Sequence, residues 1–181
     1  MMKQMKRSGM ILSIAFIATQ LLAAADRAPA TSETRITQEV RRELVTLPYY
    51  NLFDTLSYKI DGDTVTLSGK VTRPTLKSSA ENVVKSIEGV NTVNNQIEVL
   101  PLSPNDDRLR VALYQSIYGN SVLQTLAIRA VPPIHIIVEN GHVTLEGYVA
   151  NSMQKTVAGM QANTVSGVFS VTNNLLEDSK S

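Results

Sequence analysis

The chain has 181 residues, of which 43% are hydrophobic and 18% are charged, and its formal net charge is +1. It contains no cysteine, which excludes disulfides, thiolate nucleophiles, iron–sulfur clusters and thiolate zinc sites. The near-neutral charge disfavours nucleic acid as a partner, because that affinity requires many contacts from Lys and Arg to phosphate.

The first 25 residues have the pattern of a secretion signal. Three positive charges come first: Lys3, Lys6 and Arg7. An apolar stretch from Met10 to Leu22 and a small-residue cleavage site at Ala23–Ala25 follow. The stretch is shorter than the roughly 20 apolar residues that span a membrane, so a cleaved signal at 1–25 is favoured over a retained anchor. We expect a periplasmic chain from about residue 26 that is not a lipoprotein, because it has no cysteine to acylate, with 14 basic and 16 acidic residues and a net charge of −2.

A seven-residue motif occurs twice. VTLSGKV at 65–71 returns as VTLEGYV at 143–149, which is 78 positions later. The stretch 89–95 returns at the same spacing as 167–173, with Gly-Val at its start and Asn at its end. A spacing that holds across two blocks indicates one structural unit used twice.

The first copy is predicted to occupy residues 34–100, after a flexible tether at 26–33. A helix is indicated first, because Ile36, Val40 and Leu44 share one helical face. The apolar and aromatic loop at 49–53 follows. It either closes the core or forms a lip for a partner, and the core role is favoured because small domains need every large apolar side chain.

Two strands, a helix and a third strand complete the first copy. Alternating apolar residues at 56–60 and 65–69 flank Gly62-Asp63, which suits a hairpin turn and places Ile60 opposite Val65. A helix then begins at Pro74 and a strand covers 93–100. We therefore predict an α+β fold of two tandem αββαβ domains, each a three-stranded mixed sheet covered on one face by two helices.

The second copy is predicted at 103–178, after a short connector that its prolines make stiff. Its first helix matches the first copy at an offset of 73, whereas its strands match at 78, so five extra residues lie within 118–133. This apolar insertion is expected to pack on the core as a short helix, with a binding lip as the alternative. Asn140-Gly141 predicts a type I′ turn between the two hairpin strands.

The recurring residues resemble the BON domain. In the first copy they are Val65–Leu67, Gly69, Val71, Gly89–Val90, Val93 and Asn95. In the second copy they are Val143–Leu145, Gly147, Val149, Gly167–Val168, Val171 and Asn173. The glycines are expected to serve the backbone, at turns, close-packed strands and helix ends, rather than to bind phosphate.

The resemblance implies a non-enzymatic envelope module that binds a phospholipid or membrane surface and supports envelope integrity or the osmotic stress response. The alternative is a periplasmic chaperone or adaptor that binds other envelope proteins. Neither role needs a cofactor or a metal. The sequence is consistent with a non-enzymatic role, because it lacks the catalytic motifs Gly-x-Ser-x-Gly and His-Glu-x-x-His and a phosphate-binding Walker loop.

Both histidines are predicted to lie on the outer face of the second hairpin. The register pairs His142 with Glu139 and His135 with Glu146, and it separates the two histidine backbones by roughly 13 Å. Cross-strand charge pairs on a solvated or domain-facing surface are therefore favoured over a shared metal ion.

The second helices of the two copies differ along one face. Polar residues at 75, 79 and 82 become Met153, Val157 and Met160 at the offset of 78, with the helical spacing i, i+4, i+7. This apolar stripe either buries against the first copy or the insertion, or is a docking face for acyl chains or a partner. In the second case Lys155 and Arg129 would serve nearby headgroups.

Overall fold

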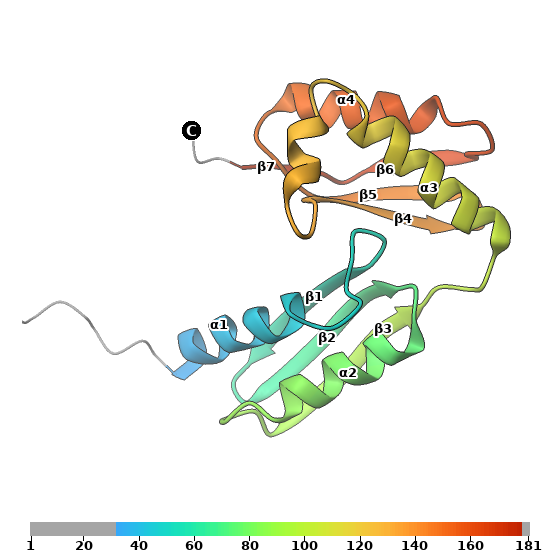
Figure 1. The fold of residues 1–181 in the computed structure, drawn as a ribbon. Helices are drawn as coiled ribbons and strands as arrows, with labels where there is room; N and C mark the ends of the chain where they lie inside the picture. The colour runs from blue at the N-terminus through green and yellow to red at the C-terminus, as the bar shows by residue number, and fades with distance from the viewer. Residues whose placement is uncertain (1–31, 179–181) are drawn as a thin grey trace, which may run out of the picture. The chain divides into compact units, whose positions relative to one another are not determined.

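The computed structural model describes residues 32–178 (Figure 1). The predicted signal at 1–25 lies outside the described residues, as does most of the predicted tether. Helix α1 already begins at Ser32, inside the stretch expected to be tether. Within residues 32–178, no helix is both long enough and apolar enough to cross a membrane.

The first repeat has the predicted order of elements. These are α1 (Ser32–Val45), β1 (Thr55–Asp61), β2 (Thr64–Val71), α2 (Pro74–Lys85) and β3 (Thr92–Val99). Strand β2 is central, antiparallel to β1 and parallel to β3, and Ile60 pairs with Val65 as predicted. Buried residues of both helices and the sheet form one core: Ile36, Val40, Leu44, Val65, Leu67, Leu76, Ala80, Val84 and Ile97.

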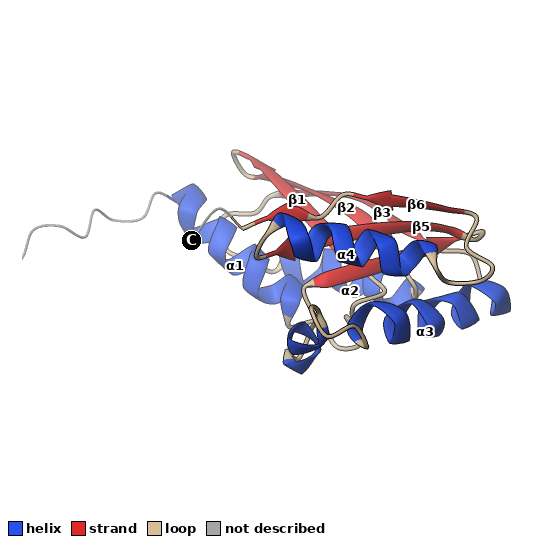
Figure 2. Ribbon diagram, turned by 90° about the horizontal axis from the view of Figure 1, so that it is seen from above, coloured by secondary structure: helices blue, strands red, loops and turns tan. Residues whose placement is uncertain are grey.

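The second repeat repeats this order with one addition. Its elements are α3 (Pro104–Tyr118), the short 3₁₀ helix η1 (Gln124–Ile128), β4 (Ile134–Glu139), β5 (His142–Val149), α4 (Ser152–Asn163), β6 (Ser170–Asn173) and β7 (Leu176–Glu177). Both β6 and β7 run parallel to β5, so the predicted last strand is broken in two. Helices α3 and α4 lie on one face of this sheet (Figure 2). The predicted α+β class with two mixed sheets is confirmed.

The turn and the insertion of the second repeat also follow the prediction. Asn140 and Gly141 both have positive φ, at 53° and 79°, as a type I′ turn requires. In the insertion, Leu123 is fully buried and Leu126 packs against the same core, so η1 covers the core rather than standing away from it.

Two of the motif glycines permit a close approach of neighbouring strands. Gly69 has φ +127° and Gly147 has φ +112°. A Cβ would lie 2.2 Å from the Thr55 carbonyl oxygen at Gly69 and 2.0 Å from the Pro133 carbonyl oxygen at Gly147. No larger residue fits either position, which explains why both copies carry glycine there.

The other two motif glycines do not end their helices, contrary to the prediction. Helix α2 ends at Lys85 and α4 at Asn163, and in each case a right-handed residue caps the helix. Gly89 and Gly167 come later and turn the chain toward the last strand. A further turn separates each helix end from its glycine: the Val90 N–H donates to the Ile87 carbonyl at 3.1 Å, and the Val168 N–H to the Val165 carbonyl at 3.3 Å.

The recurring asparagine joins the second helix to the last strand. Asn95 Nδ2 donates to the Lys77 carbonyl at 3.0 Å, and Asn173 Nδ2 donates to the Lys155 carbonyl at 2.8 Å. The Oδ1 atom of each accepts from the backbone N–H two residues later. The motif therefore holds helix and strand together in both repeats.

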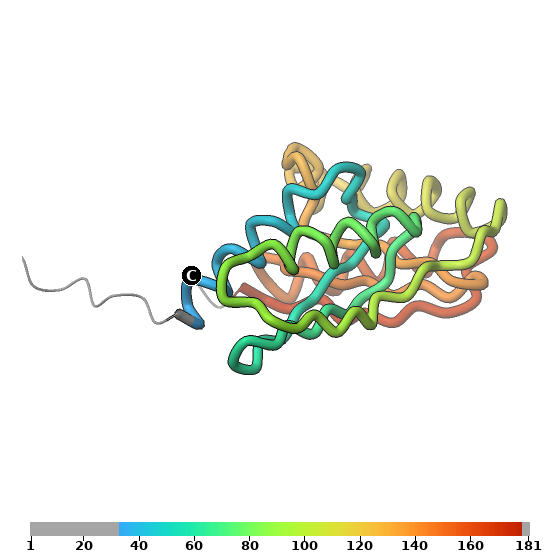
Figure 3. Tube along the Cα trace, turned by 90° about the horizontal axis from the view of Figure 1, so that it is seen from below, coloured from blue at the N-terminus to red at the C-terminus, as the bar shows by residue number. Residues whose placement is uncertain are grey.

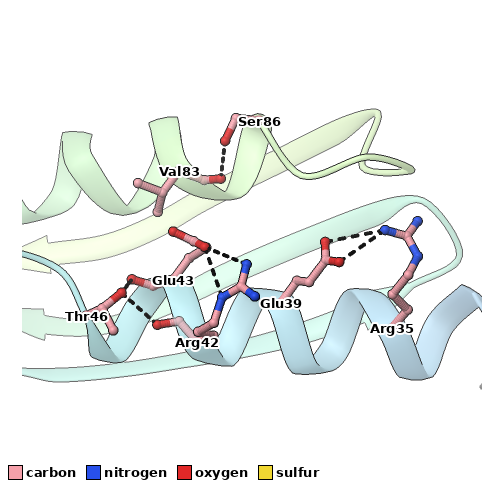
Figure 4. Close-up of polar contacts among 7 residues, drawn as sticks. All are labelled: Arg35, Glu39, Arg42, Glu43, Thr46, Val83 and Ser86. Carbon is pink, nitrogen blue, oxygen red and sulfur yellow. Dashed lines mark hydrogen bonds and ion pairs between the residues drawn. The ribbon is translucent and has the colours of Figure 1, made fainter.

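Surface ion pairs line α1, as Figure 4 shows for Arg35 with Glu39 and Arg42 with Glu43. Exposed pairs of this kind each stabilise a protein by less than about 1 kcal/mol. Arg35 also donates to the Glu88 carbonyl at 3.0 Å, which fastens α1 to the chain after α2. The outer face of α1 is thus solvated and polar.

The loop at 48–54, named the docking loop below, contacts the second repeat. Tyr50 packs on the first core as predicted, but Leu52 and Phe53 pack against the core of the second repeat. The Leu52 carbonyl accepts from the Ile136 N–H of β4 at 2.7 Å. The chain itself passes from β3 into α3 through the connector at 100–103 (Figure 3).

Candidate docking face on the second repeat

The candidate face belongs to α4, which its first turn and its small residues hold on the sheet. The Asn151 side chain accepts from the Gln154 N–H at 3.0 Å and caps the helix. Ala158 and Ala162 are fully buried against the core. At Gly159 a Cβ would lie 2.8 Å from Asn173 Nδ2, so the helix sits close to the last strand.

This close packing leaves the predicted stripe on the outer side of α4. Met153 is 65% exposed and Met160 is 62% exposed, whereas Val157 between them is half-buried against the second core. The expected alternative, burial of the whole stripe against the first copy or the insertion, is therefore not seen, and Val157 packs on the core of its own repeat. The two methionines are accessible, and their role in docking stays a prediction.

The two basic residues assigned to this face are separated. Lys155 lies on α4 and is half-buried, while its backbone carbonyl accepts from Asn173. Arg129 is exposed directly after η1, next to Ile128, which is 85% exposed. Among residues 32–178, no hydrogen bond or ion pair joins Arg129 to α4. Arg129 thus follows η1, whereas Lys155 and the stripe belong to α4.

The charge of α4 differs from that of its counterpart. Helix α2 carries Lys77, Glu81 and Lys85, whereas α4 carries Lys155 alone and no acidic residue. An apolar face beside a single positive charge has no local repulsion toward an anionic surface. The sequence change at 153–160 therefore replaces a solvated helix face with one that an anionic or apolar partner can approach.

Further exposed apolar side chains lie on the second repeat and were not predicted. Tyr148 and Leu176 pair across β5 and β7 and are 61% and 54% exposed. Phe169, 80% exposed, contacts the His142 ring edge-on at 4.9 Å between centroids. The alternation of β5 places Tyr148 on the outer face of the sheet, and this sequence pattern could have predicted its exposure.

The histidine region has the predicted register but different partners. Glu139 pairs with Lys70 and Glu146 accepts from Thr55 Oγ1 at 2.8 Å, so both carboxylates face the first repeat. The hydrogen bond to Glu139 raises the pKa of Lys70. His142 Nδ1 lies 2.7 Å from Ser170 Oγ. The predicted cross-strand positions and the domain-facing option are confirmed, but the hydrogen bonds and the ion pair of the two histidines and the two glutamates go to other residues, most of them in the first repeat.

Comparison with known proteins assigns the repeats. The BON domain family model matches residues 32–101 and again residues 105–177. The chain belongs to the BON domain family. The predicted resemblance is thereby confirmed, and the two αββαβ repeats are its two BON domains.

A curated BON-type relative covers most of the chain. Osmotically-inducible protein Y of Escherichia coli (strain K12) is 33% identical over 155 residues, which span 79% of this chain and 71% of the relative. Two solved structures of CdsD, a structural protein of the type III secretion system of Chlamydia trachomatis, each share 14% sequence identity with this chain. They cover 81% and 78% of this chain and 94% and 96% of their own, at TM-scores of 0.29 and 0.28, which are too low to support any inference.

Proposed function

We propose that this BON-domain protein is a non-enzymatic module of the periplasm that docks on the phospholipid surface of the envelope through α4. The observation that carries the proposal is the exposure of Met153 and Met160 on a helix with no acidic residue. Unbranched methionine side chains adapt to irregular apolar surfaces such as acyl chains. Lys155 and Arg129 would contact the headgroups.

The same proposal includes a role in the osmotic stress response and in envelope integrity. Its support is the similarity to a relative that is named for osmotic induction. A peripheral rather than an inserted attachment fits the described helices, none of which is long and apolar enough to cross a membrane. Docking would then depend on a few apolar contacts and on surface charge.

Co-sedimentation with vesicles tests the proposal. The vesicles contain phosphatidylethanolamine with or without phosphatidylglycerol, and the variant is Met153→Glu with Met160→Glu. Burial of one methionine side chain is worth roughly 1.5–3 kcal/mol, so we expect the double variant to bind anionic vesicles more than about tenfold more weakly.

The first BON domain offers a matched control. Thr75→Glu with Asn82→Glu changes the same positions of α2 by the same charge, and both residues are exposed. We expect this variant to bind like the wild type. Equal losses in both double variants, or no loss in the methionine variant, would show that the stripe is not the lipid site.

The adaptor role is the alternative outcome of the same variants. In that outcome, the wild-type chain fails to sediment with any of the vesicles and yet retains specific envelope proteins in a periplasmic pull-down. That result would replace the lipid proposal with the chaperone or adaptor role. Loss of that retention in the methionine variant alone would assign the stripe to protein docking.

A further inference from the structure

His135 lies where the two BON domains meet. Its Nδ1 is 2.6 Å from the backbone carbonyl oxygen of Asp54 in the docking loop. A carbonyl oxygen only accepts hydrogen bonds, so Nδ1 carries the hydrogen. The tautomer of neutral His135 is thereby fixed, and Nε2 is the nitrogen that takes up a second proton.

The docking loop is held rigidly by the first BON domain. The buried Asp54 carboxylate accepts from the Thr72 N–H at 2.7 Å, from Thr72 Oγ1 at 2.8 Å and from the Asn51 N–H at 3.2 Å. Asn51 Oδ1 in turn accepts from the Phe53 N–H at 2.8 Å. A preformed loop of this kind docks without a large loss of its own conformational entropy.

The loop covers the outer edge of β4. The carbonyls of Leu52 and Asp54 bond to the neighbouring residues Ile136 and His135. Strand β4 is the edge strand of its sheet, so this contact satisfies groups that would otherwise face water. His135 is therefore one of two hydrogen-bonded points that fasten the docking loop to the second domain.

The charged and titratable groups around His135 come from both domains. The docking loop contributes Asp54 and Tyr50, whose ring centroid lies 5.8 Å from that of His135. Strand β5 contributes Glu146, directly across from His135 and hydrogen-bonded to Thr55. Burial raises the pKa of Tyr50 to about 12, so Tyr50 stays neutral in any physiological range.

We propose that His135 is a pH-sensitive clamp: docking buries the neutral ring between the loop and β4, and protonation at Nε2 would bury a charge there, so that the two BON domains separate in acid although the Nδ1 donor is kept. The clamp works through the geometry of one side chain between a rigid loop and a strand edge. It regulates the arrangement of the domains and is independent of the lipid role of α4.

The direction of the pH effect on docking follows from the burial of the His135 ring. Burial lowers the pKa of His135, and this effect exceeds the opposite influence of Asp54 and Glu146. In the separated state the ring is in water, with an ordinary pKa of about 6.5. The separated state therefore binds the proton more readily, and the docked population falls as the pH drops below about 6.5.

Distance measurements between spin labels test the clamp. Because the chain has no cysteine, Asn82→Cys on α2 and Thr156→Cys on α4, both exposed, give unique labelling sites. We expect one narrow distance distribution at about pH 7.5 and a broad distribution with longer distances at about pH 5. A narrow distribution at both values would overturn the proposal.

Two histidine variants show which histidine causes the pH response of the distance distribution. His135→Asn keeps an N–H donor near the position of Nδ1 but does not titrate, so its distribution should stay narrow at both pH values. His142→Asn removes the exposed histidine of the same hairpin and should respond like the wild type. A pH response that persists in His135→Asn, or disappears in His142→Asn, contradicts the clamp.

A titration of His135 in the wild-type chain by NMR keeps the test decisive if His135→Asn fails to dock. A pKa of the His135 ring clearly below that of His142 supports the clamp. A pKa of His135 equal to or above that of His142 overturns it, since protonation would then not favour separation.

Discussion

The hydroxyl of Tyr118 fastens the start of β4 to α3. It donates to the Ile134 carbonyl at 2.8 Å and accepts from the Ile134 N–H at 3.0 Å, and both contacts are buried. Burial raises the pKa of this phenol, so the hydroxyl stays protonated and keeps both roles. One side chain thus provides both hydrogen bonds that Ile134 would otherwise find in a neighbouring strand.

Tyr118→Phe should therefore destabilise the second BON domain. Removing the hydroxyl leaves a buried N–H and a buried carbonyl unpaired, which costs about 1–3 kcal/mol for each group. Urea unfolding followed by circular dichroism measures the loss. Tyr114→Phe is the matched control, because Tyr114 is 37% exposed and its ring only stacks on that of Tyr118 at 5.3 Å. Equal losses in the two variants would contradict the role of the hydroxyl.

Residue roles were predictable where the repeat displayed them. Gly69 and Gly147 recur at matching positions, and the structure shows the same close backbone approach in both copies. Tyr118 ends α3, and its counterpart at the offset of 73 is Val45 at the end of α1, which has no hydroxyl. The Tyr118 hydroxyl meets Ile134 because the inserted chain between α3 and β4 folds back, and no local sequence pattern encodes that contact.

At the scale of elements, Asp106 ties the start of α3 to the β4–β5 turn. Ser103 Oγ caps the helix by accepting from the Asp106 N–H at 3.2 Å. The buried Asp106 carboxylate accepts from the N–H groups of Asn140 and Gly141, each at 2.9 Å. Arg110, one turn later, donates to the Val138 carbonyl at 2.7 Å. Helix and hairpin are thereby held in one register.

Asp106→Ala should loosen this joint. The two turn N–H groups would lose a charged acceptor, and such bonds contribute about 1.5–3 kcal/mol each, so we expect a loss of about 3 kcal/mol or more in the free energy of unfolding. Thermal and urea unfolding measure it. Asn105→Ala, at an exposed neighbouring position, should change stability by less than about 0.5 kcal/mol. A small effect at Asp106 would show that packing alone holds the hairpin.

The sequence predicted the elements better than the ties between them. Ser103 followed by Pro104 is a pattern typical of a helix start, and acidic residues in the first turn of a helix complement its dipole. The structure gives Asp106 a partner more than thirty positions away. Similarly, the predicted three-stranded sheet has a single last strand, but the chain breaks between β6 and β7, where Leu175 is buried in the core.

At the scale of the whole described chain, Ile137 reveals which sheet face is covered. It is only 4% exposed, yet it belongs to neither hydrophobic core. The residues two positions before and after it, His135 and Glu139, lie on the same outer face of β4. They contact Asp54 and Lys70 of the first BON domain. An apolar residue on that face was visible in the sequence, but its cover was not, because contacts between domains leave no periodic signal.

Ile137→Thr should weaken the contact between the domains while leaving each domain folded. Threonine keeps the β-branched shape that suits a strand, so β4 should persist. The substitution replaces the buried ethyl group of isoleucine by a hydroxyl, which removes about 1–2 kcal/mol of apolar burial. The equilibrium between docked and separated domains then shifts roughly tenfold toward separation. The spin-label pair at 82 and 156 should then show a broadened distribution even at neutral pH. Ile128→Thr, at a position that is 85% exposed, should leave the distribution narrow. If both variants stay narrow, the polar contacts of the docking loop suffice, and the burial of Ile137 adds little to the join.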